Sequence, residues 1–166
     1  MLMKLYMVPL APNPTKVMLY IAEREALGNL MGIEQVVVNT LKGRQREPEH
    51  LARNPFGSLP VLELDDGSYI KESRAVIGYL EDKFPEGSLL GDSPETRGHA
   101  RDIERICDVR LASLMGGYVH AKKSPLGLSP DPERAAEIEA SLQAPLDYLE
   151  GLLGDGRQLL TGERVS

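Results

Sequence analysis

Two polar residues, Glu72 and Ser73, stand where a strand-forming segment gives way to a helix-forming one. The first N–H groups of a helix have no partner within it and the helix dipole is positive there, so this junction favours an anion. Pro60 precedes the strand-forming segment, and a cis bond before it would turn the chain sharply and expose the peptide of Leu59. An exposed peptide edge beside such a helix start suits a small peptide-like anion.

The elements that must position these residues follow one another closely. Val61–Leu64 is a short apolar run rich in strand formers, and Asp66-Gly67 is a strong signal for a hairpin turn. The residues after the turn predict a partner strand. From Ser73 onward, apolar residues recur with helical spacing until Pro85 ends the pattern. The predicted order is strand, turn, strand and helix.

The preceding residues predict a second structural unit. Lys4–Pro9 is expected as a strand, Thr15 to Leu27 as a helix and Gln35–Asn39 as a second strand. Strand, helix and strand at this spacing predict a right-handed parallel crossover. Together with the later hairpin and helix this gives βαβ followed by ββα, so we expect an α/β thioredoxin-like N-terminal domain.

The stretch from Asn54 to Pro85 resembles the glutathione-binding half of the cytosolic glutathione transferase superfamily. The most specific pattern of that family is Asn-Pro-Phe-Gly-x-Leu-Pro-Val-Leu followed by Glu-Ser-x-Ala-Ile/Val-x-x-Tyr-Leu, and the match is close along the whole segment. A lone Glu-Ser pair would mean little, whereas the ordered set is specific. The resemblance implies the thioredoxin-like fold and glutathione as co-substrate, and it implies no metal.

The loop before the first helix holds the residue that the resemblance makes catalytic. In thioredoxins and glutaredoxins this loop carries Cys-x-x-Cys, and its lack of cysteine here argues against dithiol chemistry by the protein's own thiols. Ala11 lies at the Ser or Thr position of several transferase classes. Asn13 matches the Asn of some bacterial and fungal members, which hydrogen-bonds the glutathione sulfur. The compatible alternative is that Asn13 caps the helix.

The resemblance also implies how glutathione is held. Glu72 would take the ammonium of the γ-glutamyl end, and Ser73 with the helix dipole would take its carboxylate. The backbone of Leu59 would pair with the cysteinyl part. Arg46 suits the glycine carboxylate, and a solvated run of charges is the alternative for its loop. The expected glutathione-binding residues are Gln45, Arg46, Ser58, Leu59, Glu72 and Ser73.

Composition restricts the classes of protein that fit. The chain has 166 residues, with 25 Asp and Glu against 19 Lys and Arg, and this acidic balance argues against nucleic-acid binding. No apolar run reaches the roughly 18 residues that would span a bilayer, so no membrane association is expected. A single cysteine, Cys107, forms no intrachain disulfide, and we therefore expect the cytoplasm.

The second half of the chain predicts an all-α substrate domain. Glu86–Gly91 is expected as a linker, which sets the domains at 1–85 and 86–166. The C-terminal residues, Thr161 to Ser166, resemble the start of the family's capping box, Ser-x-x-Asp, and stop on its serine. We therefore expect an incomplete helical domain whose C-terminal helices are missing, through truncation or disorder.

Two long helices are predicted within this second half. Ser93 is suited to cap the first, and Gly116-Gly117 is a candidate bend within it. The second begins at Asp131 or Pro132 and carries an apolar stripe.

The expected function is that of a glutathione transferase in detoxification. A homodimer would activate the glutathione thiolate for attack on a small hydrophobic electrophile. A glutathione-dependent disulfide reductase, isomerase or ether-cleaving lyase of the same family remains open. So does a non-catalytic binding module, because Ala11 supplies no hydroxyl. The residues that select the electrophile lie in the less specific half, so its identity stays open.

Overall fold

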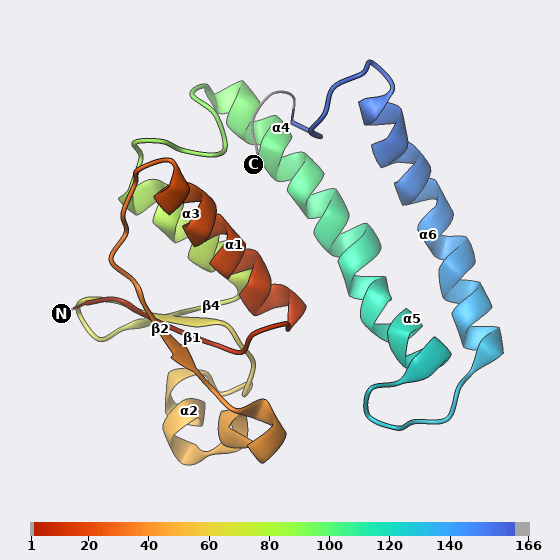
Figure 1. Ribbon diagram of the computed structural model, residues 1–166, viewed down its shortest axis with the longest axis horizontal. Coiled ribbons are helices and arrows are strands. Elements are labelled where there is room, and N and C mark those ends of the chain that lie inside the picture. The colour runs from red at the N-terminus through yellow and green to blue at the C-terminus, as the bar shows by residue number, and fades with distance from the viewer. Residues whose placement is uncertain (1, 162–166) are drawn as a thin grey trace. The chain divides into compact units, whose positions relative to one another are not determined.

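The computed structural model describes residues 2–161, which divide into two compact units between Ser88 and Leu89. The first unit combines a four-stranded sheet with helices (Figure 1). Its elements in chain order are β1 (Lys4–Met7), α1 (Pro12–Ala26), β2 (Glu34–Val37), η1 (Thr40–Lys42), η2 (Arg44–Arg46), α2 (Pro48–Arg53), β3 (Val61–Glu63), β4 (Tyr69–Lys71) and α3 (Ser73–Lys83).

The sheet has the strand order β2-β1-β3-β4. β1 and β2 are parallel, and the helix α1 connects them. β3 is antiparallel to β1, with Tyr6 opposite Val61, and β4 is antiparallel to β3, with Val61 opposite Lys71. This βαβ-ββα order confirms the predicted thioredoxin-like fold.

The turn between β3 and β4 forms as its sequence predicts. Gly67 has a φ of 81°, a conformation that a residue without a Cβ adopts without strain. Its N–H donates to the carbonyl of Leu64 over 3.0 Å. The Asp66 carboxylate accepts from the N–H of Ser68 over 2.8 Å, which closes the turn from the other side.

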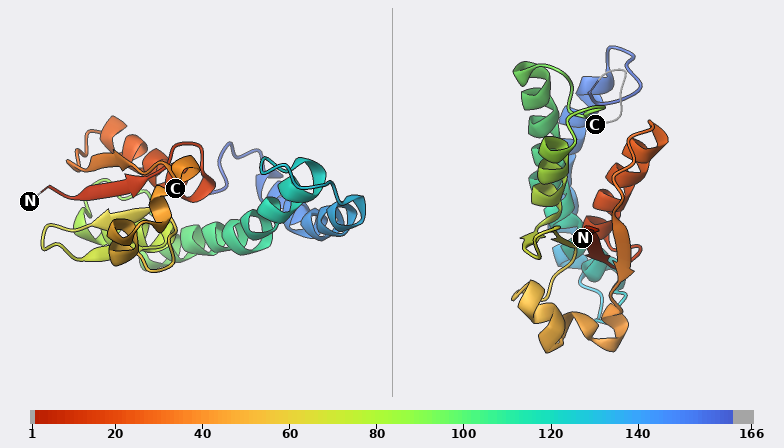
Figure 2. Two further views of the ribbon diagram at one scale, coloured as in Figure 1. Left: turned by 90° about the horizontal axis from the view of Figure 1, so that it is seen from below. Right: turned by 90° about the vertical axis from the view of Figure 1, so that its left-hand side faces the viewer.

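The two faces of the sheet carry different helices. α1 and α3 lie on one face and α2 on the other, as the views in Figures 1 and 2 agree. Successive residues of β1 point to opposite faces, and Tyr6 faces α2, since the Arg53 guanidinium lies 4.1 Å from its ring centroid. The neighbours of Tyr6, Leu5 and Met7, are buried on the face of α1 and α3.

The start of α1 differs from the prediction. The helix begins at Pro12, three residues before the predicted Thr15. Proline at the first helical position gives up an N–H that would lack a helical partner and has its φ already set, so Pro12 starts the helix well. Ala11 precedes it without a side-chain cap.

A buried ion pair joins α1 to α3 and to the chain that follows α3. Arg24 Nη1 donates to Glu81 Oε1 over 3.1 Å and to the Tyr20 hydroxyl oxygen over 2.6 Å, and both charged side chains are fully buried. Arg24 Nη2 donates to the carbonyls of Phe84 and Glu86 over 2.6 and 2.7 Å. Burial and the hydrogen bond to Glu81 raise the pKa of Tyr20, so its hydroxyl stays protonated and donates to the carboxylate.

The second unit consists of one long helical run, which α4 (Pro94–Ile106), the π-helical segment η3 (Cys107–Ala112) and α5 (Ser113–Lys123) form without a break, and of α6 (Pro132–Leu153), which returns antiparallel to it (Figure 1). Ser93 and Thr96 form a capping box at α4, and the Asp131 carboxylate accepts from the N–H of Arg134 at α6. These starts agree with the predicted ones.

The irregular segment of the second unit lies earlier than the predicted bend. Gly116 and Gly117 are both inside α5, and the departure from α-helical geometry falls at Cys107–Ala112. A Cβ added to Gly117 would lie 3.2 Å from Ile138 Cδ1, so this glycine allows α6 to approach closely. Across the described residues, no helix is both long and apolar enough to cross a bilayer. The expected C-terminal capping motif lies outside the described residues from Gly162 onward.

The buried pair generates a stability prediction. Arg24→Met should lower the free energy of unfolding by about 3–5 kcal/mol, because it leaves the Glu81 carboxylate buried without its cation. The double change Arg24→Met/Glu81→Leu should recover much of this loss. Urea unfolding followed by circular dichroism measures both.

The matched control is Arg134→Met, which breaks an ion pair whose side chains are 60% and 61% exposed. It should cost no more than about 1 kcal/mol. An Arg24→Met protein as stable as this control would contradict the structural role of the buried pair.

Candidate functional site

The β3–β4 register brings two predicted site segments together. Because Val61 lies opposite Lys71, the residue before β3, Pro60, comes opposite the residue after β4, Glu72. The Leu59–Pro60 peptide bond is cis, the isomer considered from the sequence. The Leu59 peptide therefore lies beside the first turn of α3, at the end of the sheet where β3 begins and β4 ends. We call this end of the sheet the ligand edge.

The start of α3 has the features of an anion site. Glu72 precedes the helix with φ 68° and ψ 122°, a conformation that non-glycine residues rarely adopt. Its carboxylate is exposed and caps no helical N–H. The first intrahelical bond runs from the N–H of Val76 to the carbonyl of Glu72, so the N–H of Ser73 has no partner in the helix. Ser73 itself is buried.

The start of α1 belongs to the same edge. Tyr6 lies opposite Val61, so the loop that leads from β1 to α1 leaves the sheet beside Pro60. Asn13 is the second residue of α1 and is exposed, and its side chain does not cap the helix. The capping alternative for Asn13 is therefore wrong.

The donors at this helix start are few. Pro12 and Pro14 have no N–H, and the N–H of Thr15 is bonded to the carbonyl of Ala11 over 3.0 Å. Between residues 12 and 15, the N–H of Asn13 is the one peptide donor without a helical partner. Both this N–H and the side-chain amide of Asn13 can therefore donate to a ligand.

Ser58 is held by Asn54, a residue of the sequence motif that is not among the predicted site residues. The side-chain amide of Asn54, which is fully buried, donates to Ser58 Oγ over 2.9 Å and to the Ser58 carbonyl over 3.0 Å. Because Ser58 Oγ accepts this bond, its own hydrogen remains available to donate to an acceptor such as a carboxylate. The asparagine of the Asn-Pro-Phe-Gly motif was the available signal.

Gln45 and Arg46 lie in η2, next to the loop that carries Ser58. A Cβ added to Gly57 would lie 3.0 Å from the Gln45 carbonyl oxygen, so the two backbones approach closely there. Gln45 Oε1 is buried and has no hydrogen-bond partner among the described residues. Arg46 is exposed and forms no ion pair within residues 2–161, which leaves its guanidinium available for a carboxylate.

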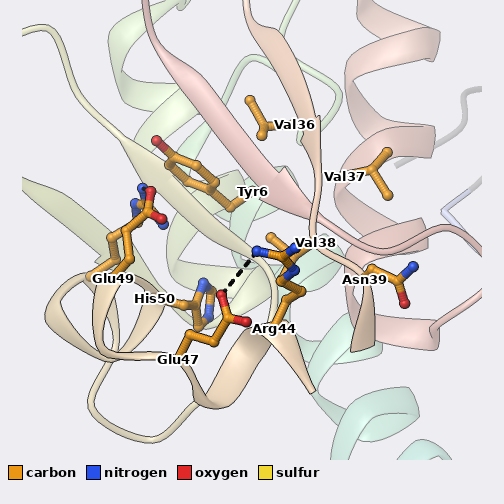
Figure 3. Close-up of a pocket in the computed structure, with 10 residues that line it drawn as sticks. Tyr6, Val36, Val37, Val38, Asn39, Arg44, Glu47, Glu49 and His50 are labelled. Carbon is orange, nitrogen blue, oxygen red and sulfur yellow. Dashed lines mark hydrogen bonds and ion pairs between the residues drawn. The ribbon is translucent and has the colours of Figure 1, made fainter. Parts of the chain in front are cut away.

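A cavity of about 260 Å³ lies on the opposite face of the sheet, between β2 and α2 (Figure 3). None of the predicted site residues lines it. Two ion pairs flank it, Arg44 with Glu47 over 3.2 Å and Arg53 with Glu49 over 2.5 Å. It is therefore distinct from the place where Leu59, Glu72 and Ser73 gather, although Gln45 and Arg46 lie in the chain between two of its lining residues, Arg44 and Glu47.

One tyrosine, Tyr6, and the single cysteine, Cys107, are the remaining candidate reactive groups. Burial and a hydrogen bond to Glu63 raise the pKa of Tyr6 to about 12, so its phenol stays neutral at physiological pH. Burial raises the pKa of the Cys107 thiol as well, which disfavours the nucleophilic thiolate. Among residues 2–161, no three His, Cys, Asp or Glu side chains are grouped so that they could hold a metal ion.

Comparison with known proteins finds one matching family model and several similar proteins. The family model described as the N-terminal domain of glutathione S-transferase matches residues 12–83. Glutathione S-transferase 2 of Saccharomyces cerevisiae is 31% identical over 150 residues, which cover 90% of this chain. A zeta-class glutathione S-transferase of Euphorbia esula is 41% identical over 168 residues, which cover 93% of this chain.

A solved structure of a similar protein has the same fold. The crystal structure of a glutathione S-transferase domain-containing protein from Marinobacter aquaeolei is 29% identical, has a TM-score of 0.81, and is matched over 98% of this chain and 80% of its own. The match spans 62% of the yeast relative's length and 72% of the Euphorbia relative's length. With the sheet order, the ordered motif and these likenesses in agreement, the chain belongs to the glutathione S-transferase family.

Proposed function

We propose that this protein is a glutathione transferase that binds glutathione along the sheet edge formed by Leu59, Glu72 and Ser73. The observation that carries the proposal is the register of β3 and β4, which sets a peptide edge beside the first turn of α3. Glutathione offers that edge a peptide backbone and an anionic end. The Leu59 backbone pairs with the cysteinyl part, and Glu72 holds the γ-glutamyl ammonium.

Two groups of donors take the carboxylates of glutathione in this proposal. Ser73, the dipole of α3 and the available hydroxyl of Ser58 receive the γ-glutamyl carboxylate. Gln45 and the exposed Arg46 receive the glycine carboxylate, for which a guanidinium is well suited. The approach of Gln45 to Gly57 supports this grouping, because it brings both sets of donors to one loop.

Asn13 is the proposed thiol-activating residue. A free thiol has a pKa of ~8.5, so at neutral pH most of it is the weaker, protonated nucleophile. An amide cannot take the proton, which leaves to water, but it can donate a hydrogen bond that stabilises the thiolate. The two donors of Asn13 at the start of α1 support this role.

The electrophile is proposed to be small and hydrophobic. A hollow of about 660 Å³ in the second unit supports this, because its walls are largely apolar, with Ile106, Val109, Leu114 and Pro145 among them. Assays with an aryl halide, a glutathione-capped disulfide and an isomerisable diene acid distinguish transferase, reductase and isomerase activity. A protein that binds glutathione and turns over none of them would be a binding module. Cytoplasmic location stays a prediction.

Removal of the Glu72 carboxylate should weaken glutathione binding. Loss of a charge-assisted partner costs ~1.5–3 kcal/mol, so Glu72→Ala should raise the Kd roughly ten- to hundredfold in calorimetry. Glu72→Gln should fall between this variant and the wild type, because it keeps an acceptor oxygen. Glu34→Ala, an exposed glutamate at the other end of the sheet, is the control. Wild-type affinity in Glu72→Ala would refute the site.

Removal of the Asn13 amide should raise the pKa of the bound thiol and leave the affinity for glutathione nearly unchanged. Asn13→Ala keeps the peptide N–H, so the thiolate loses one donor and the rate should fall roughly ten- to a thousandfold. Thiolate absorbance against pH measures the shift, and Asn13→Ser should restore part of it. Asn29→Ala, beyond the other end of α1, is the control. An unchanged thiol pKa in Asn13→Ala would assign activation to other donors, such as the Thr15 hydroxyl.

A homodimer is proposed as the working form. Apolar side chains on either side of α2 support it, with Phe56 79% and Leu41 100% exposed. Light scattering at micromolar concentration should give twice the 18.3 kDa of one chain, and Phe56→Ser should shift the mass toward the monomer. A wild-type protein that scatters as a monomer would contradict the proposal.

A further inference from the structure

Two buried side chains of one helix face hold the same backbone carbonyl. His50 lies in α2, and Asn54 is the first residue after this helix. Their i, i+4 spacing brings both side chains to one side of it. His50 Nε2 lies 3.1 Å and Asn54 Nδ2 3.0 Å from the carbonyl oxygen of Ser58. His50 is 2% exposed and Asn54 is 0% exposed. The Ser58 carbonyl is therefore fixed from the side of α2.

The hydrogen bond of His50 determines the form of its ring. A carbonyl oxygen can only accept, so Nε2 carries the proton and donates. In the neutral ring Nδ1 is then an acceptor, and it is buried without a partner among residues 2–161. Figure 3 shows the ring beside Glu47 and below Tyr6, at the wall of the cavity. An unpaired buried acceptor disfavours folding, and an apolar side chain at position 50 would avoid this cost. The favourable contribution of His50 is therefore the hydrogen bond that its Nε2 donates.

The planarity of the peptide carries this restraint to the next residue. In a trans peptide the C=O of Ser58 and the N–H of Leu59 point in opposite directions. With the Ser58 oxygen directed toward His50 and Asn54, the Leu59 N–H must point away from α2. The Leu59 peptide is the one that the proposed function pairs with the cysteinyl part of glutathione.

We propose that His50 and Asn54 are positioning residues that aim the Leu59 N–H and the Ser58 hydroxyl at glutathione. Neither touches the ligand; both act through Ser58. The inference rests on the proposed function, and it adds a buried support on the α2 side of the sheet to the residues of the ligand edge. Their loss should lower affinity for glutathione and leave activation of its thiol, at Asn13, intact.

Three substitutions at His50 test the inference. The amide nitrogen of a glutamine side chain can occupy the place of Nε2, and that of asparagine the place of Nδ1. His50→Leu should raise the Kd for glutathione roughly three- to tenfold, as expected for one hydrogen bond. His50→Gln should restore most of the affinity and His50→Asn should not. The KM for glutathione should follow the Kd while kcat and the thiol pKa stay unchanged.

The outcomes separate this inference from the proposed function. A wild-type protein that does not bind glutathione overturns both. If the wild type binds and His50→Gln and His50→Asn have equal affinities, the inference is overturned and the proposed function stands. A His50→Leu protein that fails to fold leaves this comparison intact, because both polar variants test the position of the donor. A fall in kcat with unchanged KM would also contradict a positioning role.

Discussion

The antiparallel register of β3 and β4 is the constraint on which the site depends. With Val61 opposite Lys71, the residues just before β3 and just after β4 must lie side by side. A slip of one residue would turn the side chains of one strand to the other face and move the Leu59 peptide away from α3. The Asp66-Gly67 turn fixes this register locally, and pairing of β3 with β1 brings the start of α1 to the same edge.

The two faces of the sheet support this edge by different means. On one face, the Arg24–Glu81 pair ties α1 to α3, the two helices whose first turns supply donors. On the other face, His50 and Asn54 hold the Ser58 carbonyl. Both supports are buried polar groups, which cost free energy unless they are paired. They favour one defined arrangement of the edge rather than contributing apolar burial.

The sequence predicted those features that neighbouring residues determine. The hairpin, the start of α3, the cap at Ser93 and the start of α6 depend on residues a few positions apart, and each agrees with the structure. The Arg24–Glu81 pair was not predicted, because its partners lie 57 residues apart and each resembles a solvated charge when viewed alone.

Two local features were also missed. The start of α1 was placed too late because Pro12 and Pro14 were treated as loop residues, although proline suits a first helical turn. His50 was passed over because a histidine in a polar segment gives no signal of burial. The roles of all the expected site residues, from Asn13 to Ser73, stay predictions that rest on the family resemblance.

The most direct test is an NMR titration of the ¹⁵N-labelled protein with glutathione. If the register of β3 and β4 builds the ligand edge, the largest amide shifts should fall on Leu59, Ser73 and Asn13, three positions far apart in sequence. Val36 and Val37, which line the cavity on the α2 side, should shift little. Shifts concentrated on Val36 and Val37, or no shifts at millimolar glutathione, would contradict the account.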